Sequence, residues 1–175
     1  MTLVVDHTER LKAIDPEESF IVSAPAGSGK TGLITQRILC LLGTVNHPEE
    51  ILSITFTRKA AAEMAARVHS ALQTAANEPR PENQYEAQTW DFAQKALQQD
   101  QNLNWNLLDM PNRLRIQTID SFCRYIARQF SLETKLGDLS EPSDQPEVHY
   151  QSASRSLLQK LETDDALTPH LTVLL

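Results

Sequence analysis

The stretch Ser19-Phe-Ile-Val-Ser-Ala-Pro-Ala-Gly-Ser-Gly-Lys-Thr31 decides the fold. Its first part, Ser19 to Ala24, is a short run of apolar and β-forming residues, which predicts a buried strand. Gly27 and Gly29 then predict a tight turn, because glycine adopts backbone conformations that a Cβ forbids. From Thr31 to Leu42 the apolar residues recur at helical spacing. The sequence here predicts a strand, a glycine-rich loop and a helix in direct succession.

The loop has the residue types that polyphosphate binding needs, and it matches the P-loop pattern with Ala24 in place of the usual first glycine. Glycine lets backbone N–H groups approach phosphates, and the helix that follows directs its N-terminal dipole at the anion. Lys30 supplies charge to the β- and γ-phosphates, and the Thr31 hydroxyl can ligate Mg²⁺. We therefore expect Lys30 and Thr31 to be catalytic, Thr31 to hold the metal, and the nucleotide to contact Ala24, Pro25, Ala26, Gly27, Ser28, Gly29, Lys30 and Thr31.

The rest of the chain continues the alternation of strands and helices. Apolar runs predict further strands over 51–56 and 114–118, and Thr57 is placed to cap a helix. Alternating strands and helices indicate an α/β fold with a parallel sheet flanked by helices. Loops are expected over 77–83 and 137–146, and helices over 6–14, 31–42, 58–76, 85–99, 119–130 and 150–161.

Composition excludes several classes of protein. The chain has 175 residues, of which 41% are hydrophobic and 22% charged, as in globular domains. The longest apolar run, over 38–42, is far short of the ~20 residues that cross a membrane, and the N-terminus has no signal-peptide pattern. Two cysteines form no disulfide framework, which fits a reducing cytoplasm. The net charge of −7 argues by itself against nucleic acid, but residues 131–175 carry −5 of it.

Three segments, in order, resemble the UvrD/Rep-like superfamily 1 DNA helicases. They are the phosphate loop, Thr55-Phe-Thr-Arg-Lys-Ala-Ala-Ala-Glu-Met64, which is similar to motif Ia, and Thr118-Ile-Asp-Ser-Phe-Cys123, which is similar to motif Ib. The residues of these segments are most similar to those of the exonuclease V beta-subunit (RecB/AddA-like) branch. The resemblance covers roughly residues 6–130. It implies a RecA-like P-loop fold, incomplete here, with the first lobe over 1–76, an inserted helical segment over 77–112, a return to the lobe over 113–136 and an acidic helical segment over 137–175.

The resemblance also implies ATP with Mg²⁺, single-stranded or duplex DNA as partner, and a partner protein of a helicase-nuclease. At strand-to-helix turns, hydroxyl groups, basic side chains and helix N–H groups converge, which suits a DNA phosphate. Arg113 and Arg115 add positive charge beside the second turn. Arg10 matches a basic residue common in the segment where the family has its adenine-reading glutamine, and we expect it to bind the nucleotide. The implied DNA contacts are Thr57, Arg58, Lys59, Thr118, Asp120 and Ser121.

Some features of the family have no counterpart in this sequence. No apolar strand that ends in Asp-Glu follows the phosphate loop, and the later Gln and Arg motifs and the second lobe are absent. We therefore expect the chain to belong to a larger architecture and to lack turnover on its own. Two alternatives remain open at this point: a small self-contained P-loop kinase, with Asp120 as the acid on the metal side, and a non-catalytic fragment that binds nucleotide.

Overall fold

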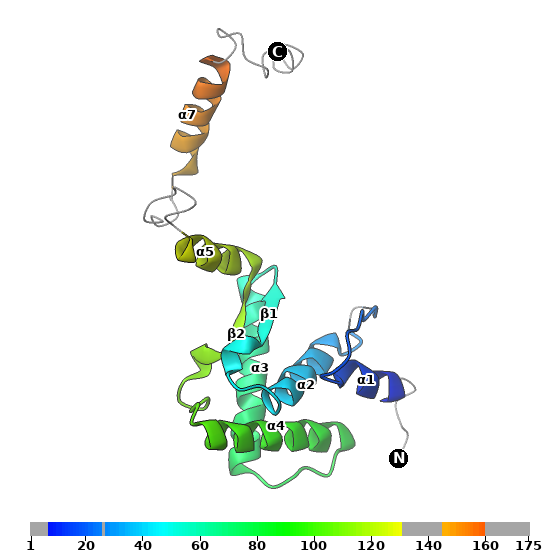
Figure 1. The fold of residues 1–175 in the computed structure, drawn as a ribbon. Helices are drawn as coiled ribbons and strands as arrows, with labels where there is room; N and C mark the ends of the chain where they lie inside the picture. Colours follow the sequence, from blue (N-terminus) through cyan, green and yellow to red (C-terminus); the bar gives the residue numbers. More distant parts are fainter. Residues whose placement is uncertain (1–6, 26, 131–144, 160–175) are drawn as a thin grey trace. The chain divides into compact units, whose positions relative to one another are not determined.

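The computed structural model describes residues 7–25, 27–130 and 145–159. The chain forms two compact units, residues 1–129 and 130–175. In the second unit the described residues form helix α7 (Pro146–Gln159). The first unit contains, in order, α1 (His7–Ile14), α2 (Lys30–Leu42), the short 3-10 helix η1 (Pro48–Glu50), β1 (Leu52–Thr55), α3 (Arg58–Asn77), α4 (Gln84–Leu103), the 3-10 helix η2 (Pro111–Arg113), β2 (Arg115–Thr118) and α5 (Ile119–Gln129) (Figure 1).

The described sheet is small and parallel. The strands predicted over 51–56 and 114–118 are confirmed as β1 and β2, which pair one to one from Leu52 with Arg115 to Thr55 with Thr118. Helix α3 packs against both strands, and α5 follows β2 directly. Because the strands are parallel, both carboxyl ends lie at the same edge of the sheet. The helices α3 and α5 therefore begin side by side.

The predicted strand over Ser19–Ala24 is wrong. This segment is assigned to no strand and has none beside it among the described residues, and Ile21 is fully exposed at 100%. Val22 and Phe20 are also exposed. An apolar run with β-forming residues predicts burial, whereas a strand exists only where a second backbone completes the hydrogen-bond ladder. The described part of the chain is thus mostly helical with a two-stranded sheet, and the α/β expectation holds in part.

One apolar core joins α2, α3 and α4. Trp105, in the turn after α4, closes it: the indole is 2% exposed, and its Nε1 donates to the Asn46 carbonyl at 3.0 Å. The segment after the loop at 77–83 therefore shares its core with the helix that follows the phosphate loop. The proposed domain boundaries remain a prediction. Core residues with almost no exposed surface are Leu39, Leu42, Val68, Leu72, Ala93, Ala96 and Leu107.

Helix ends follow local capping chemistry. Thr57 caps α3, as predicted, by accepting a hydrogen bond from the Ala60 N–H at 3.1 Å. Asn83 caps α4 through its side-chain oxygen, so that helix begins one residue earlier than predicted and continues to Leu103. Helix α7 begins at Pro146, four residues before the predicted start, because proline suits a first helical turn. Asp6, the first residue of the helix expected over 6–14, and most of the loop over 137–146 lie outside the described residues.

Arg113 links the segment that precedes β2 to the segment that precedes β1. Its Nε and Nη2 donate to the Glu49 carboxylate at 2.7 and 3.1 Å, and its Nη1 donates to the Trp105 carbonyl at 2.9 Å. The expectation that this arginine adds charge beside Thr118 is wrong. Arg113 precedes β2 and therefore lies at the opposite end of the sheet, and its charge is paired with Glu49.

The Arg113–Glu49 pair predicts a pH-dependent contribution to stability. The guanidinium holds the pKa of Glu49 below its ordinary value of 4.5. Because the folded-state pKa is lowered, the stabilisation is complete above pH 4.5 and is lost as the pH falls through the folded value. We expect Glu49→Gln to lower the free energy of unfolding by about 1 kcal/mol at pH 7, a value discounted for partial exposure.

Urea unfolding of both proteins at pH 7 and near pH 3 measures this effect. The difference between wild type and Glu49→Gln should shrink at the lower pH. Asp91→Asn is the matched control, because Asp91 forms a similar two-bond pair with Arg80, at 2.7 Å for both bonds, but on the exposed surface of α4. A control effect as large as that of Glu49→Gln would contradict the assigned role of the partly buried pair.

Candidate nucleotide site and strand-edge surface

The loop before α2 is shaped by two glycines with positive φ. Gly27 has φ 77° and Gly29 has φ 84°, values that L side chains rarely adopt. A Cβ on Gly27 would meet no atom within 4 Å, so backbone conformation and not crowding requires glycine there. Gly29 is the N-cap of α2, and its carbonyl accepts the Leu33 N–H at 3.1 Å. The sequence therefore produces a turn that leads directly into a helix N-terminus.

Lys30 folds back into this loop. Its Nζ donates to the carbonyl oxygens of Ala24 at 2.6 Å and Pro25 at 2.5 Å. Thr31 follows in the first turn of α2 with its side chain exposed, and its carbonyl accepts the Thr35 hydroxyl at 2.9 Å. Ala26, also expected in this site, lies outside the described residues. The ammonium group is thus held at the N-terminus of α2 by neutral carbonyls.

The residues present fit a phosphate group. The Ser28 hydroxyl is buried beside the loop and has no hydrogen-bond partner, so it is an unsatisfied polar atom. The space beside Gly27 is open. A cavity of about 270 Å³ adjoins the loop, and its lining includes Arg10, Ser28 and Lys30. Positive charge, helix N–H groups and an unsatisfied hydroxyl are the groups that bind anions at such positions.

Two arginines bond to backbone carbonyls of the segments around the loop. The sequence analysis predicted none of these bonds. Arg37 of α2 donates to the carbonyls of Ala13, Asp15 and Glu18 at 2.8, 2.7 and 2.8 Å, and its guanidinium lies 5.6 Å from the Phe20 ring centroid. Arg10 of α1 donates from Nη2 to the Ser28 carbonyl at 2.6 Å. Bonds to backbone carbonyls leave no residue pattern in a sequence, so no signal could have identified these contacts.

The second group of expected site residues lies at the shared carboxyl edge of β1 and β2. Thr57, Arg58 and Lys59 are exposed at the start of α3. Across the edge, Thr118 is 6% exposed and its hydroxyl is hydrogen-bonded to the Ser121 hydroxyl at 2.9 Å. The Ser121 N–H also donates to the Thr118 hydroxyl at 3.2 Å, so Thr118 caps α5. Asp120 is exposed in the same turn.

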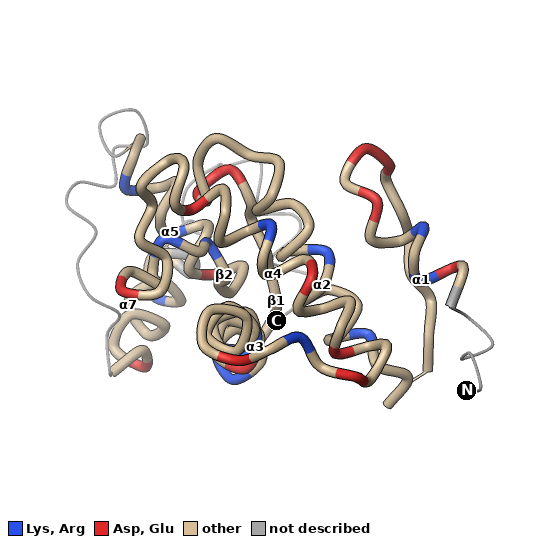
Figure 2. Tube along the Cα trace, turned by 90° about the horizontal axis from the view of Figure 1, so that it is seen from below, with Lys and Arg blue, Asp and Glu red and all other residues tan. Residues whose placement is uncertain are grey.

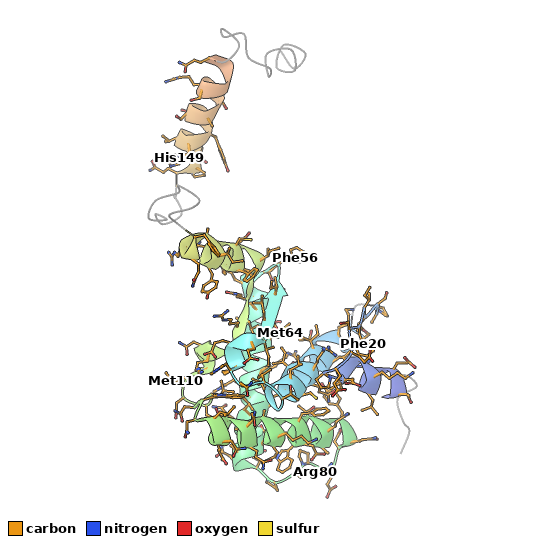
Figure 3. All side chains as sticks on the ribbon, viewed as in Figure 1. Phe20, Phe56, Met64, Arg80, Met110 and His149 are labelled. Carbon is orange, nitrogen blue, oxygen red and sulfur yellow. The ribbon has the colours of Figure 1, made fainter. Side chains whose placement is uncertain are left out.

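Phe56 is a residue of this edge that sequence reasoning placed in a buried strand. Its side chain is 87% exposed, and Figure 3 places it at the end of β1 on the side of α5. It lies two residues after Ile54, which is 45% exposed on the same face of the strand. The exposure of Phe56 could have been predicted from the sequence. Side chains alternate along a strand, so residues 52, 54 and 56 share one face. An exposed aromatic ring therefore adjoins Thr57 and Arg58.

Basic side chains also lie on α5 and at the start of β2. Arg115 donates to the Tyr125 hydroxyl at 3.3 Å and lies 5.0 Å from the centroid of that ring. Arg124 and Arg128 are exposed on α5, and Figure 2 shows basic positions along α5 and at β2. Although the chain has a net charge of −7, this surface has local positive charge.

Two further observations apply to the part of the chain that the structure describes. No helix there combines the length and apolarity that crossing a membrane requires. No three His, Cys, Asp or Glu side chains gather there in a group that could hold a metal ion.

Comparison with known proteins gives a consistent result. The chain is 35% identical over 119 residues to an ATP-dependent helicase/nuclease subunit from Clostridioides difficile, and the match covers 66% of this chain and 8% of that protein. It is 32% identical over 129 residues to the protein of the same name from Lactobacillus acidophilus (73% and 9%) and 31% identical over 144 residues to that from Desulforamulus reducens (80% and 10%).

The chain thus spans about a tenth of the length of these curated relatives. No solved structure matches it significantly. Residues 6–172, nearly the whole chain, match the UvrD/REP helicase N-terminal domain. The chain therefore belongs to the family of the UvrD/REP helicase N-terminal domain, and it is distantly homologous to the AddA-like helicase/nuclease proteins of the RecB-like branch.

Proposed function

We propose that this chain is the ATP-binding N-terminal part of an ATP-dependent DNA helicase or translocase, of the helicase-nuclease kind, which couples ATP hydrolysis to movement on single-stranded DNA. One observation carries the proposal. The Lys30 ammonium lies inside a loop framed by two positive-φ glycines, at the N-terminus of α2. This combination of charge, open backbone and helix dipole suits polyphosphate.

In the proposed site, Gly27 and Gly29 let the loop backbone approach the phosphates. Lys30 exchanges its bonds to the loop carbonyls for the β- and γ-phosphates, and the exposed Thr31 hydroxyl holds Mg²⁺. Bound ATP supplies the free energy of phosphate transfer to water. We expect the 175 residues to bind nucleotide without turnover, because no apolar strand that ends in Asp-Glu follows the loop. Steady ATP hydrolysis by the purified chain would contradict this expectation.

The proposed DNA surface is the carboxyl edge of β1 and β2. We assign DNA phosphates to the hydroxyl groups of Thr57 and Ser121, the charges of Arg58 and Lys59 and the first turns of α3 and α5, because both helices begin at this edge. Such groups bind phosphates and read no base sequence. Phe56 adds an exposed ring on which a base can stack. The relatives are named as one component of a helicase/nuclease, so a second protein of that assembly belongs to the same proposal.

Arg58 and Phe56 should contribute to DNA binding in distinguishable ways. Arg58→Ala should weaken binding to a labelled oligothymidine and reduce the slope of log affinity against log salt by about 0.7, the value for one phosphate of a single strand. Phe56→Ala should weaken binding about tenfold with an unchanged slope, because stacking releases no counterions. Fluorescence anisotropy at four or more potassium chloride concentrations measures both quantities.

Arg80→Ala is the control for a general loss of charge, because Arg80 pairs with Asp91 on α4, and it should leave the affinity unchanged. If Arg58→Ala and Arg80→Ala changed the affinity and the salt slope equally, binding would reflect overall charge and the proposed surface would be wrong.

A further inference from the structure

Strand β1 has a free lateral edge, which is the side of the strand that faces away from β2. Among the described residues no other strand pairs with β1, so the described sheet ends there. A strand at the edge of a sheet presents unpaired backbone N–H and C=O groups that can pair with a further strand. Natural edges are protected by proline or by charged side chains, and the residues over 52–56 include neither. The lateral edge of β1 is therefore open to strand addition.

The two faces of β1 differ in what covers them. Ser53 lies in register with Ile116, whose side chain packs against the apolar core, so this face points to the interior. The opposite face carries Leu52, Ile54 and Phe56, all of which are exposed. A strand that pairs with the lateral edge would place its own side chains beside these three and reduce their contact with water.

The charges at the two ends of β1 have opposite signs. Glu49 and Glu50 precede the strand, whereas Arg58 and Lys59 follow it, and of these only Glu49 is paired with a described residue of the same chain, Arg113. An antiparallel neighbour with the same sequence brings the acidic end of one copy to the basic end of the other, at both ends of the pair. A parallel neighbour would instead set like charges side by side, which is destabilising.

We infer that this lateral edge pairs two copies of the chain, antiparallel, about a two-fold axis at Ile54. In that register Ile54 lies opposite Ile54 of the second copy, and Leu52 lies opposite Phe56. Apolar side chains opposite each other across a strand pair stabilise a sheet. Glu50 of one copy is then directed toward Arg58 of the other.

The two small sheets become one sheet of four strands in the order β2-β1-β1-β2. The same surface of each copy forms the interface, so the assembly closes at two copies. The inference is independent of the proposed function, because the pairing requires neither nucleotide nor DNA.

Sedimentation equilibrium of the full chain at increasing concentrations, without nucleotide or DNA, tests the inference. We expect the wild type to follow a monomer–dimer equilibrium with a dissociation constant of about 10–100 μM, as befits a small interface. Ile54→Lys places two ammonium groups opposite each other at the axis and should weaken the dimer about tenfold or more. Ile21→Lys is the matched control, because Ile21 is fully exposed in a segment outside the sheet, and it should leave the dimer unchanged.

Charge reversal tests the antiparallel register. Arg58→Glu and Glu50→Arg should each weaken the dimer about fivefold, because each sets like charges together at both ends of the pair. The double variant Glu50→Arg/Arg58→Glu restores opposite charges and should recover most of the wild-type affinity. Glu50 also accepts the His47 N–H at 2.8 Å, so thermal unfolding confirms that each variant is folded before its mass is measured.

Other results would overturn the inference. A wild type that sediments as a monomer at every concentration, or as species larger than two copies, would contradict a closed pair. Equal weakening by Ile21→Lys and Ile54→Lys would show that association follows exposed apolar surface in general. A dimer that persists in Ile54→Lys would place the contact elsewhere, and a double charge variant as weak as the single ones would exclude the antiparallel register.

Discussion

Replacement of Lys30 by alanine is expected to weaken nucleotide binding about 100-fold. It removes the ammonium that bonds to two loop carbonyls and that, in the site we propose, would bind phosphate oxygens in their place. The effect should exceed that of any other single substitution in the loop. Lys30 is the first residue of α2, and its backbone continues a helix anchored by Leu39 and Leu42. The side chain can therefore be removed without disturbing the helix.

Titration of Mg·ATP against the purified chain, by calorimetry or by competition with a fluorescent analogue, measures this change. Lys95→Ala is the matched control, because Lys95 is an exposed lysine in the middle of α4. The control should bind nucleotide as tightly as the wild type and unfold at the same temperature. Equal affinities for Lys30→Ala and wild type would rule out the proposed nucleotide site.

Trp105→Ala should be the most destabilising of these substitutions, with a loss of about 3–5 kcal/mol in the free energy of unfolding. The indole is 2% exposed in the core shared by α2, α3 and α4, and its Nε1–H bond to Asn46 would be lost with it. The Trp105 carbonyl also accepts a bond from Arg113. Removing the ring therefore opens a cavity where the turn after α4 meets the strands.

Urea unfolding followed by circular dichroism measures this loss. Trp105→Phe keeps most of the apolar volume and removes only the indole N–H, so its cost should be well below that of the alanine variant. Trp90→Ala is a second comparison, because Trp90 is only partly buried although its Nε1 donates to the Glu78 carbonyl at 3.1 Å. A Trp90→Ala cost equal to that of Trp105→Ala would contradict the placement of the core around Trp105.

The local chemistry of the sequence is sufficient to predict most helices and two strands. Thr57 identifies the start of α3 because a capping hydroxyl acts within four residues, and the apolar spacing of α2 reflects the face that it buries. The segment Ser19–Ala24 shows the limit of such reasoning. Its composition is that of a strand, but pairing depends on a second segment whose position no local pattern reports.

The candidate site likewise contains residues whose roles the sequence predicts and residues whose roles it does not. Gly27 and Gly29 are predictable because positive φ restricts the residue type. The role of Arg113 is not, because its partner Glu49 is 64 residues away and a bidentate pair at that separation leaves no periodic signal. Phe56 belongs to an apolar run that predicts the sheet interior, whereas the strand ends one residue before it. Long-range pairing and the exact end of a strand are properties of the folded chain.

The pairing of Thr55 with Thr118 also sets a length scale at the strand edge. Neighbouring strand backbones lie about 4.8 Å apart, so the turns that begin α3 and α5 are separated by one strand spacing. A nucleotide occupies about 3.4 Å along a stacked strand. On the DNA surface that we propose, the two turns would therefore contact neighbouring nucleotides. A slip of one residue in the register would turn Thr118 to the opposite face and remove one of these two contacts.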